Sequence, residues 1–222
     1  MNKDTKLVAI QGYEFWLTIC EEEIARKTTN SERKLYNFCR NACFTFTDLL
    51  INHVVNETDP NFEEDESSLG KCAFNLLSHF SQLCDYMYIE KILNYVNNNI
   101  CSKELRMREA AIIILTSTFE FPNKDQGYNF INDYIKKILE RVSENDTRIR
   151  EKACWCLEKL CKEFAEYLTK NKKTFEIIVN TITGLLENSN NKSTVFLLCS
   201  LHYLAVSLKP NEFQTSSISI LI

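Results

Sequence analysis

Apolar residues return every three to four positions along most of the chain, which is the spacing of one face of an α-helix. Only 4 Gly and 3 Pro occur among 222 residues, so long uninterrupted helices are expected. Polar breaks divide the pattern into helices at about residues 6–26, 31–56, 67–84, 88–101, 103–121, 128–144, 147–164, 173–187 and 192–208, and a further apolar segment covers 212–222. The pattern therefore predicts an all-α fold.

One segment of this pattern occurs twice. Leu105–Ala111 (LRMREAA) reappears as Thr147–Ala153 (TRIREKA), 42 positions further along the chain. A fixed period of about 40–47 residues, with two helices in each unit, is typical of HEAT and armadillo repeats. The sequence thus predicts a HEAT-repeat α-solenoid, a right-handed superhelical stack of antiparallel helix pairs whose second helices line the concave face. We expect a single array over residues 1–222 that is a fragment of a longer solenoid.

The second helices share a spacing that suits close packing between neighbouring repeats. A small residue is followed four positions later by a larger apolar residue, on the same face of the helix. We expect the small residue to let helices approach closely and the larger one to fill the layer between repeats. The pairs are Gly12/Trp16, Ala73/Leu77, Ala111/Leu115 and Ala153/Leu157.

An acidic stretch interrupts one of the predicted repeats at residues 57–68. Its densest part is Glu63, Glu64, Asp65 and Glu66. A connection longer than its neighbours is typical of a functional or disordered loop. The stretch is therefore expected to attract a Lys/Arg-rich partner over long range, in a salt-sensitive manner. A solvated insertion without a partner is the alternative interpretation.

Trp155 and the repeated arginines are the other candidates for function. Trp155 follows the small residue Ala153 by two positions, about 200° around the helix, so it is expected on a free face where its ring could stack on a cation. A core position is the alternative for Trp155, and it is the expected one for Trp16. Arg108 and Arg150 recur at one repeat position, and we expect them to form a structural ladder with polar groups such as Asp146 in a neighbouring turn.

Composition excludes several other classes. The net charge of −4 disfavours binding to nucleic acid, and the chain contains no apolar run long enough to cross a membrane. The 10 cysteines form no CxxC pair, so we expect reduced thiols in the core, no bound metal and no cofactor. The histidines, His53, His79 and His202, share no catalytic spacing. An enzyme is therefore not expected.

Taken together, the quoted segments resemble a known family. A Gln11–Trp16 helix leads into the acidic Cys20–Glu23, and the acidic insertion, Lys71–Ala73, the Arg-Glu-Ala-Ala repeat and Ala153–Trp155 follow in order. This order resembles the middle of the importin-beta (karyopherin-beta) nuclear import receptors, from about the seventh HEAT repeat to the start of the twelfth. The resemblance covers nearly the whole chain.

The resemblance implies a function in nuclear import. Family members use this region to bind the basic N-terminal segment of importin-alpha or basic cargo, and they release it to Ran-GTP. On this chain the acidic residues 63–66 and Trp155 would be the partner-binding positions, whereas Ser67 and Leu197 stand where the family has further tryptophans. Nucleoporins would bind mostly outside this segment, and the protein would shuttle between cytoplasm and nucleus through the nuclear envelope. A HEAT scaffold subunit of another complex, without Ran dependence, is the alternative.

Overall fold

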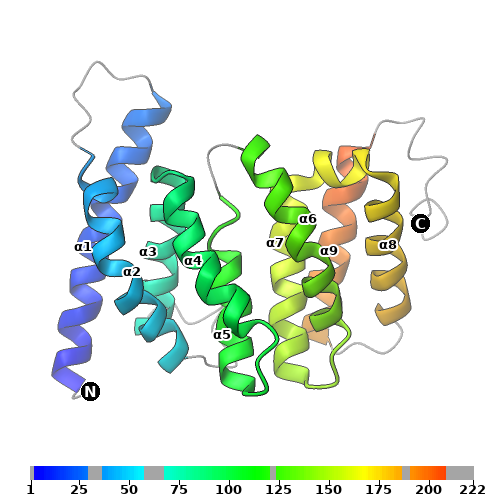
Figure 1. Ribbon diagram of the computed structural model, residues 1–222, viewed down its shortest axis with the longest axis horizontal. Helices are drawn as coiled ribbons and strands as arrows, with labels where there is room; N and C mark the ends of the chain where they lie inside the picture. Colours follow the sequence, from blue (N-terminus) through cyan, green and yellow to red (C-terminus); the bar gives the residue numbers. More distant parts are fainter. Residues whose placement is uncertain (1–2, 30–36, 58–67, 121–123, 187–190, 209–222) are drawn as a thin grey trace. The chain divides into compact units, whose positions relative to one another are not determined.

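The computed structural model describes residues 3–29, 37–57, 68–120, 124–186 and 191–208, and these residues are predominantly helical (Figure 1). No strand occurs within those ranges. The helices are α1 (Lys3–Thr28), α2 (Phe38–Asn56), α3 (Leu69–Leu83), α4 (Tyr86–Asn99), α5 (Leu105–Thr116), α6 (Lys124–Val142), α7 (Thr147–Lys170), α8 (Lys172–Leu186) and α9 (Asn191–Ser207).

The two largest differences from the predicted helix bounds are at the start of α2 and the end of α7. The helix predicted from Ser31 begins at Phe38, because Asn37 has a left-handed backbone (φ 55°, ψ 35°) that no helix can run through. The helix predicted to end at Phe164 continues to Lys170, with one non-helical residue at Phe164 (φ −126°, ψ 20°). The apolar segment predicted at 212–222 lies outside the described residues.

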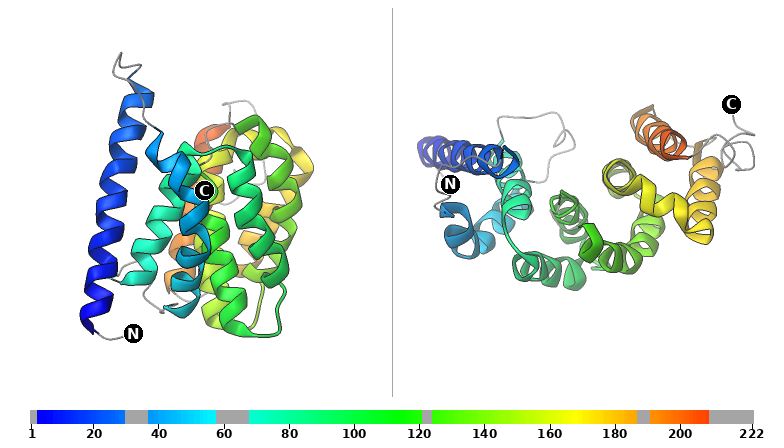
Figure 2. Two further views of the ribbon diagram at one scale, coloured as in Figure 1. Left: turned by 60° about the vertical axis from the view of Figure 1, so that its left-hand side comes forward. Right: turned by 90° about the horizontal axis from the view of Figure 1, so that it is seen from above.

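The contacts between helices divide the chain into two compact units, residues 1–126 and 127–222. In the first unit, α3 packs against both α1 and α5 in one layer, and α2 packs against α4 in the other layer (Figure 2). In the second unit, α7 packs against α9 in one layer, while α6 and α8 lie in the other (Figures 1 and 2). Each unit is therefore a two-layer stack of helix pairs. A single array across both units stays a prediction.

The predicted pairs of small and large residues are confirmed in three of the helices. Ala73, Ala111 and Ala153 are fully buried, and so are the leucines four residues after them. The pair in α1 is different. Gly12 is exposed, and a Cβ added to it would meet no atom within 4 Å, so the prediction that it lies at a close helix contact is wrong. The reason is that α1 turns its neighbouring residue Tyr13 into the core instead.

Trp16 is half-buried and belongs to an aromatic cluster of the first unit. Its ring centroid lies 5.2 Å from that of Phe46 in α2 and 6.5 Å from that of Phe80 in α3. Tilted and edge-on arrangements of this kind contribute about 0.5–1.5 kcal/mol per pair beyond the area they bury. Trp16 therefore joins three helices, as expected for a residue of the layer.

Acidic and polar side chains cap the helices. The carboxylate of Glu23 in α1 accepts hydrogen bonds from the backbone N–H groups of Phe38 (2.7 Å) and Cys39 (3.3 Å) at the start of α2. Ser68 caps α3 by accepting from the N–H of Lys71, and Asp146 caps α7 by accepting from the N–H of Ile149. Glu23, the last residue of the acidic cluster at the end of the Gln11–Trp16 segment, is thus structural.

The cysteines mostly lie in the core, as the sequence predicts. Eight of the ten are buried, Cys199 is half-buried and Cys101 is exposed. Cys20 in α1 and Cys39 in α2 place their sulfur atoms 3.2 Å apart. None of the described helices is long and apolar enough to cross a membrane.

Candidate functional site

The predicted acidic site lies outside the described residues: Glu63, Glu64, Asp65 and Glu66 belong to the stretch 58–67. The residues on either side of that stretch are described, and they are joined to each other. Glu57 follows the last turn of α2, and its carboxylate accepts a hydrogen bond of 3.1 Å from the N–H of Gly70 in the first turn of α3. The other oxygen of Glu57 pairs with Lys6 of α1 at 2.9 Å. The base of the acidic stretch is therefore fixed by contacts among three helices.

Gly70 permits this arrangement. A Cβ at Gly70 would lie 3.0 Å from the Cβ and 3.2 Å from the carbonyl oxygen of Glu57. Both distances are shorter than ordinary van der Waals contact, so a side chain at this position would push the end of α2 away from the start of α3. Glu57 and Ser68, the two ends of the predicted acidic loop, have structural roles, and only the part between them is left as a candidate surface.

Trp155 does not occupy the free face that the helical spacing predicts. Its side chain is 5% exposed, and residues 152–158 of α7 are all buried. Seven consecutive buried residues cover the whole circumference of a helix, so no position in this part of α7 faces solvent. The expected exposure of Trp155 is wrong for this reason, and its contact with a partner stays a prediction.

The repeated arginines make the same contact in both units. Arg108 in α5 donates to the carbonyl oxygen of Ser102, six residues earlier, and Arg150 in α7 donates to the carbonyl oxygen of Glu144, also six residues earlier, at 3.1 Å. Arg150 further contacts the carbonyl oxygen of Asn145 at 3.4 Å. The structural role is as predicted, but the acceptors are backbone carbonyls of the turn within the same helix pair, and Asp146 caps the helix instead. We call this contact the arginine clasp.

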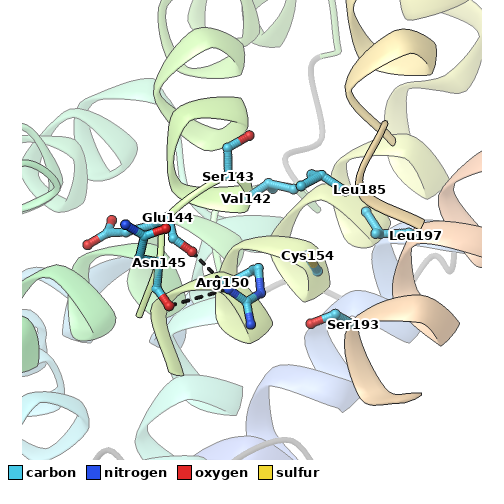
Figure 3. Close-up of a pocket in the computed structure, with 9 residues that line it drawn as sticks. All are labelled: Val142, Ser143, Glu144, Asn145, Arg150, Cys154, Leu185, Ser193 and Leu197. Atoms are coloured by element: carbon cyan, nitrogen blue, oxygen red, sulfur yellow. Dashed lines mark hydrogen bonds between the residues drawn. The ribbon is translucent and has the colours of Figure 1, made fainter. Parts of the chain in front are cut away.

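A cavity of about 150 Å³ lies beside the clasp of the second unit (Figure 3). Arg150, Glu144 and Asn145 form its polar wall, and Val142, Leu185 and Leu197 form its apolar wall. Cys154 and Ser193 also line it. Burial raises the pKa of the Cys154 thiol to about 11, although a hydrogen bond with Ser193 opposes the shift. The thiol is therefore protonated at neutral pH and is a poor nucleophile.

No group of metal-binding side chains is present in the part of the chain that the structure describes. The groups around the cavity can accept or donate hydrogen bonds, but they do not pair a nucleophile with a base. The cavity is consequently best explained as packing space next to the turn that Arg150 closes.

A second recess lies in the same unit, at the junction of α7 and α8. Its lining residues are Tyr128, Tyr167, Lys170, Asn171, Lys172 and Lys173, and its volume is about 720 Å³. The rings of Tyr128 and Tyr167 are stacked, with centroids 4.1 Å apart and planes 5° from parallel. This site is not evident from the sequence, because the two tyrosines are far apart in the chain. The cluster of lysines at 170–173 was the one signal that could have indicated it.

An exposed apolar row follows one face of α9. Val195, Leu198 and Val206 are each more than half exposed and are spaced by three to eight residues, with the exposed His202 between them. Such spacing places side chains on one helix face. Apolar surface of this kind is typical of the central part of a protein interface.

The chain is similar to curated proteins over most of its length. No family model matches it. It is 26% identical over 194 residues to importin subunit beta-1 of Saccharomyces cerevisiae, and 23% identical over 197 residues to importin subunit beta-1 of Schizosaccharomyces pombe. Each alignment covers 85% of this chain but only 22% and 23% of the relative. The chain thus spans less than a quarter of the length of these relatives.

Solved structures show the same architecture. A crystal structure of importin beta superposes with a TM-score of 0.81 at 21% identity, covering 91% of this chain and 24% of the other. Kap95p, the yeast importin-beta, matches in a structure with RanGDP (TM-score 0.76, 26% identity, 90% and 24% covered) and in one with Nup1 (TM-score 0.77, 25% identity, 90% and 24% covered). The prediction of an all-α HEAT-repeat fold is confirmed by these structures.

Proposed function

Because the chain is homologous to importin subunit beta-1 over most of its length, we propose that it is part of a nuclear transport receptor. In this proposal it binds the basic N-terminal segment of importin-alpha, or basic cargo, and yields it to Ran-GTP. It is a binding protein with no catalytic step, and it shuttles between cytoplasm and nucleus. The observation that supports the proposal is the sequence similarity over 85% of the chain to importin subunit beta-1 of two yeasts.

The solved complexes support the choice of partners. Solved structures of Kap95p include one with RanGDP and one with Nup1, and both match 90% of this chain. Ran and nucleoporins are therefore the partners we propose first for the whole receptor. Importin-alpha is proposed as a partner for a different reason, the charge complementarity between its basic segment and the acidic residues 63–66.

The described residues around the acidic stretch suit this role. Glu57, Gly70 and Lys6 hold the two ends of the stretch on the first unit, so the described residues that flank the four acidic side chains form a fixed base. A fixed base lowers the entropy that is lost when a partner binds. Their charge would increase the association rate with a basic partner and make the affinity fall with salt.

The test is a titration of the chain with a basic importin-alpha N-terminal peptide, at low and at physiological salt. Neutralising the stretch with E63Q/E64Q/D65N/E66Q is expected to weaken binding at low salt about tenfold or more, since several charge pairs are lost together. The matched control, E14Q/E90Q/E140Q/E176Q, removes the same charge from exposed positions elsewhere and is expected to retain most of the affinity. An equal loss of affinity in both variants would show that the effect depends on net charge alone, and not on residues 63–66.

Trp155 needs a milder substitution, because it is buried. Trp155→Phe keeps an aromatic ring in the core, so a loss of affinity without a loss of stability would support contact between the indole and the peptide.

Addition of Ran-GTP then distinguishes the two candidate functions. Release of the peptide supports the transport receptor, and retention of the peptide favours a HEAT scaffold of another complex.

A further inference from the structure

The recess between α7 and α8 combines two features that the proposed function does not use. One wall is the stacked pair Tyr128 and Tyr167, which Asn132 supports by donating a hydrogen bond of 2.6 Å to the hydroxyl of Tyr167. The other wall consists of three lysines within four residues, Lys170, Lys172 and Lys173. We propose that this recess, the tyrosine–lysine recess, binds an acidic peptide segment that carries an aromatic residue.

The local backbone brings the two walls together. The regular helix of α7 is interrupted at Phe164, and the last turns, which carry Tyr167 and Lys170, run across toward α8 (Figure 1). Asn171 then begins α8 by accepting a hydrogen bond of 3.3 Å from the N–H of Thr174. Tyr167 and the lysines are therefore set by the geometry of one short connection, and Tyr128 joins them from α6.

The charge of the recess favours an anionic partner. All three lysines are exposed, and the one ion pair described for them is a weak contact of 3.9 Å between Lys170 and Glu166, both more than three-quarters exposed. Among the residues that the structure describes, no carboxylate forms an ion pair with Lys172 or Lys173. The negative end of the α7 dipole and the positive end of the α8 dipole meet at this connection, so the lysine side chains supply the positive charge.

The distribution of charge and the size of the recess favour a peptide over a nucleic acid. Binding to a phosphate backbone requires a stripe of basic residues that follows the strand, and this chain has a net charge of −4 with only a local cluster here. The recess is shallow and open, and its volume of about 720 Å³ gives room for a few residues of an extended segment lying along it. Two or three carboxylates would contact the lysines, and the aromatic side chain would lie against the tyrosine pair, where ring contacts contribute specificity.

The partner differs in kind from the basic ligand of the proposed function. The two sites have opposite charge and lie in different units, so either can exist without the other. A failure of the basic peptide to bind leaves this inference intact, and a failure here leaves the transport proposal intact.

The probe is a fluorescent peptide of sequence Gly-Asp-Glu-Asp-Phe-Asp-Glu-Gly, titrated with the whole chain at low salt and followed by anisotropy. We expect K170Q/K172Q/K173Q to weaken binding about tenfold, since three surface charge pairs are lost. The control K27Q/K103Q/K136Q removes the same charge from exposed lysines outside the recess and is expected to bind nearly as the parent does. A similar loss in both variants, or no binding by the parent, would overturn the proposal.

The aromatic contact has its own test. Tyr128→Ala is expected to weaken binding roughly two- to tenfold, and a peptide with Ala in place of Phe is expected to be insensitive to that substitution, since the coupled partner is gone. Tyr167→Phe keeps the stacked ring and loses only the hydrogen bond from Asn132, so it is expected to bind nearly as the parent does. An oligothymidine of equal charge is the competitor: tighter binding of the oligonucleotide than of the peptide would assign the recess to nucleic acid and refute the peptide proposal.

Discussion

At the scale of single residues, the two glycines of the first unit stand in opposite environments. A Cβ at Gly70 meets the backbone of Glu57 at 3.2 Å, whereas a Cβ at Gly12 meets no atom within 4 Å. Gly70→Ala is therefore expected to lower the free energy of unfolding by about 1–2 kcal/mol, because overpacking at about 1–3 kcal/mol outweighs the gain of up to about 1 kcal/mol in helix propensity. Urea unfolding followed by circular dichroism measures the change.

Gly12→Ala is the control for that substitution. It gains helix propensity without any clash, so the free energy of unfolding is expected to rise by up to about 1 kcal/mol. Changes of opposite sign in the free energy of unfolding at the two positions would support the close contact at Gly70. A stabilising Gly70→Ala would show that the ends of α2 and α3 do not approach as described.

The thiols offer a second prediction at this scale. Cys101 is exposed and Cys199 is half-buried, whereas the other eight thiols are buried. Burial raises the pKa of the Cys161 thiol well above its usual range, so it is protonated as well as inaccessible. In the folded chain a thiol reagent is expected to react first with Cys101, and Cys101→Ser should remove that phase. Fast reaction of several further thiols in the parent would contradict the burial.

His53 couples stability to pH. It lies in α2, and its Nδ1 is 2.6 Å from the hydroxyl of Tyr13 in α1. Burial lowers the pKa of His53, while the nearby Glu57 opposes the shift. Below pH 6.5, the ordinary value, the unfolded chain therefore binds the proton more readily than the folded chain, and stability falls as the pH falls toward the folded-state pKa.

The expected loss is at most about 1.4 kcal/mol per pH unit, the limit for one proton. Thermal or urea unfolding between pH 7 and pH 5.5 measures it. His53→Gln is expected to flatten this dependence, whereas His202→Gln, at an exposed position in α9, provides the matched control. An unchanged profile in His53→Gln would show that another group is responsible.

At the scale of helices, the arginine clasp joins the end of one helix to the start of its partner. Arg150→Ala removes hydrogen bonds to the carbonyl oxygens of Glu144 and Asn145, so it is expected to lower the free energy of unfolding by about 1–2 kcal/mol. Arg108→Ala should have a similar effect in the first unit. Lys162→Ala, at an exposed position of α7, is the control, and an equal loss there would contradict a specific role for the clasp.

The sequence was sufficient to predict that these segments are helical. Where the helix bounds differ from the prediction, the causes are local. The apolar period of 3.6 residues follows from burial of one helix face, and it is clear in α3, α4, α6 and α8. Neither Asn37 nor Phe164 disturbs that period. Asn37 has unusual backbone angles but precedes the first residue of α2, and Phe164 keeps its apolar side chain buried. Their effects on the helix bounds therefore could not be predicted from the pattern.

The candidate site was less predictable than the fold. The spacing that placed Trp155 on a free face assumed a helix buried along one seam, but α7 is buried on all sides at residues 152–158. The repeat did predict that Arg108 and Arg150 share one role, because their sequence context is duplicated. It could not predict that backbone carbonyls are their acceptors, because every residue type has the same carbonyl group.

At the scale of the whole molecule, the two units are expected to respond independently to local change. In stacked repeats each helix pair depends mainly on its neighbours, so stability varies along the chain. Gly70→Ala is expected to increase hydrogen exchange in α2 and α3 and to leave α8 and α9 near the parent rates. Mass spectrometry of peptides from the exchanged protein measures this. A uniform increase over both units would indicate one cooperative structure.

The arginine clasp also bears on how such a chain can change its length. Arg108 and Arg150 bind carbonyls six residues earlier, inside their own helix pair, so these two hydrogen bonds need no group from the adjoining repeat. Duplication or deletion of one 42-residue segment would carry each arginine together with its acceptors. Arrays of different lengths could therefore arise by recombination without breaking the arginine clasp of any repeat.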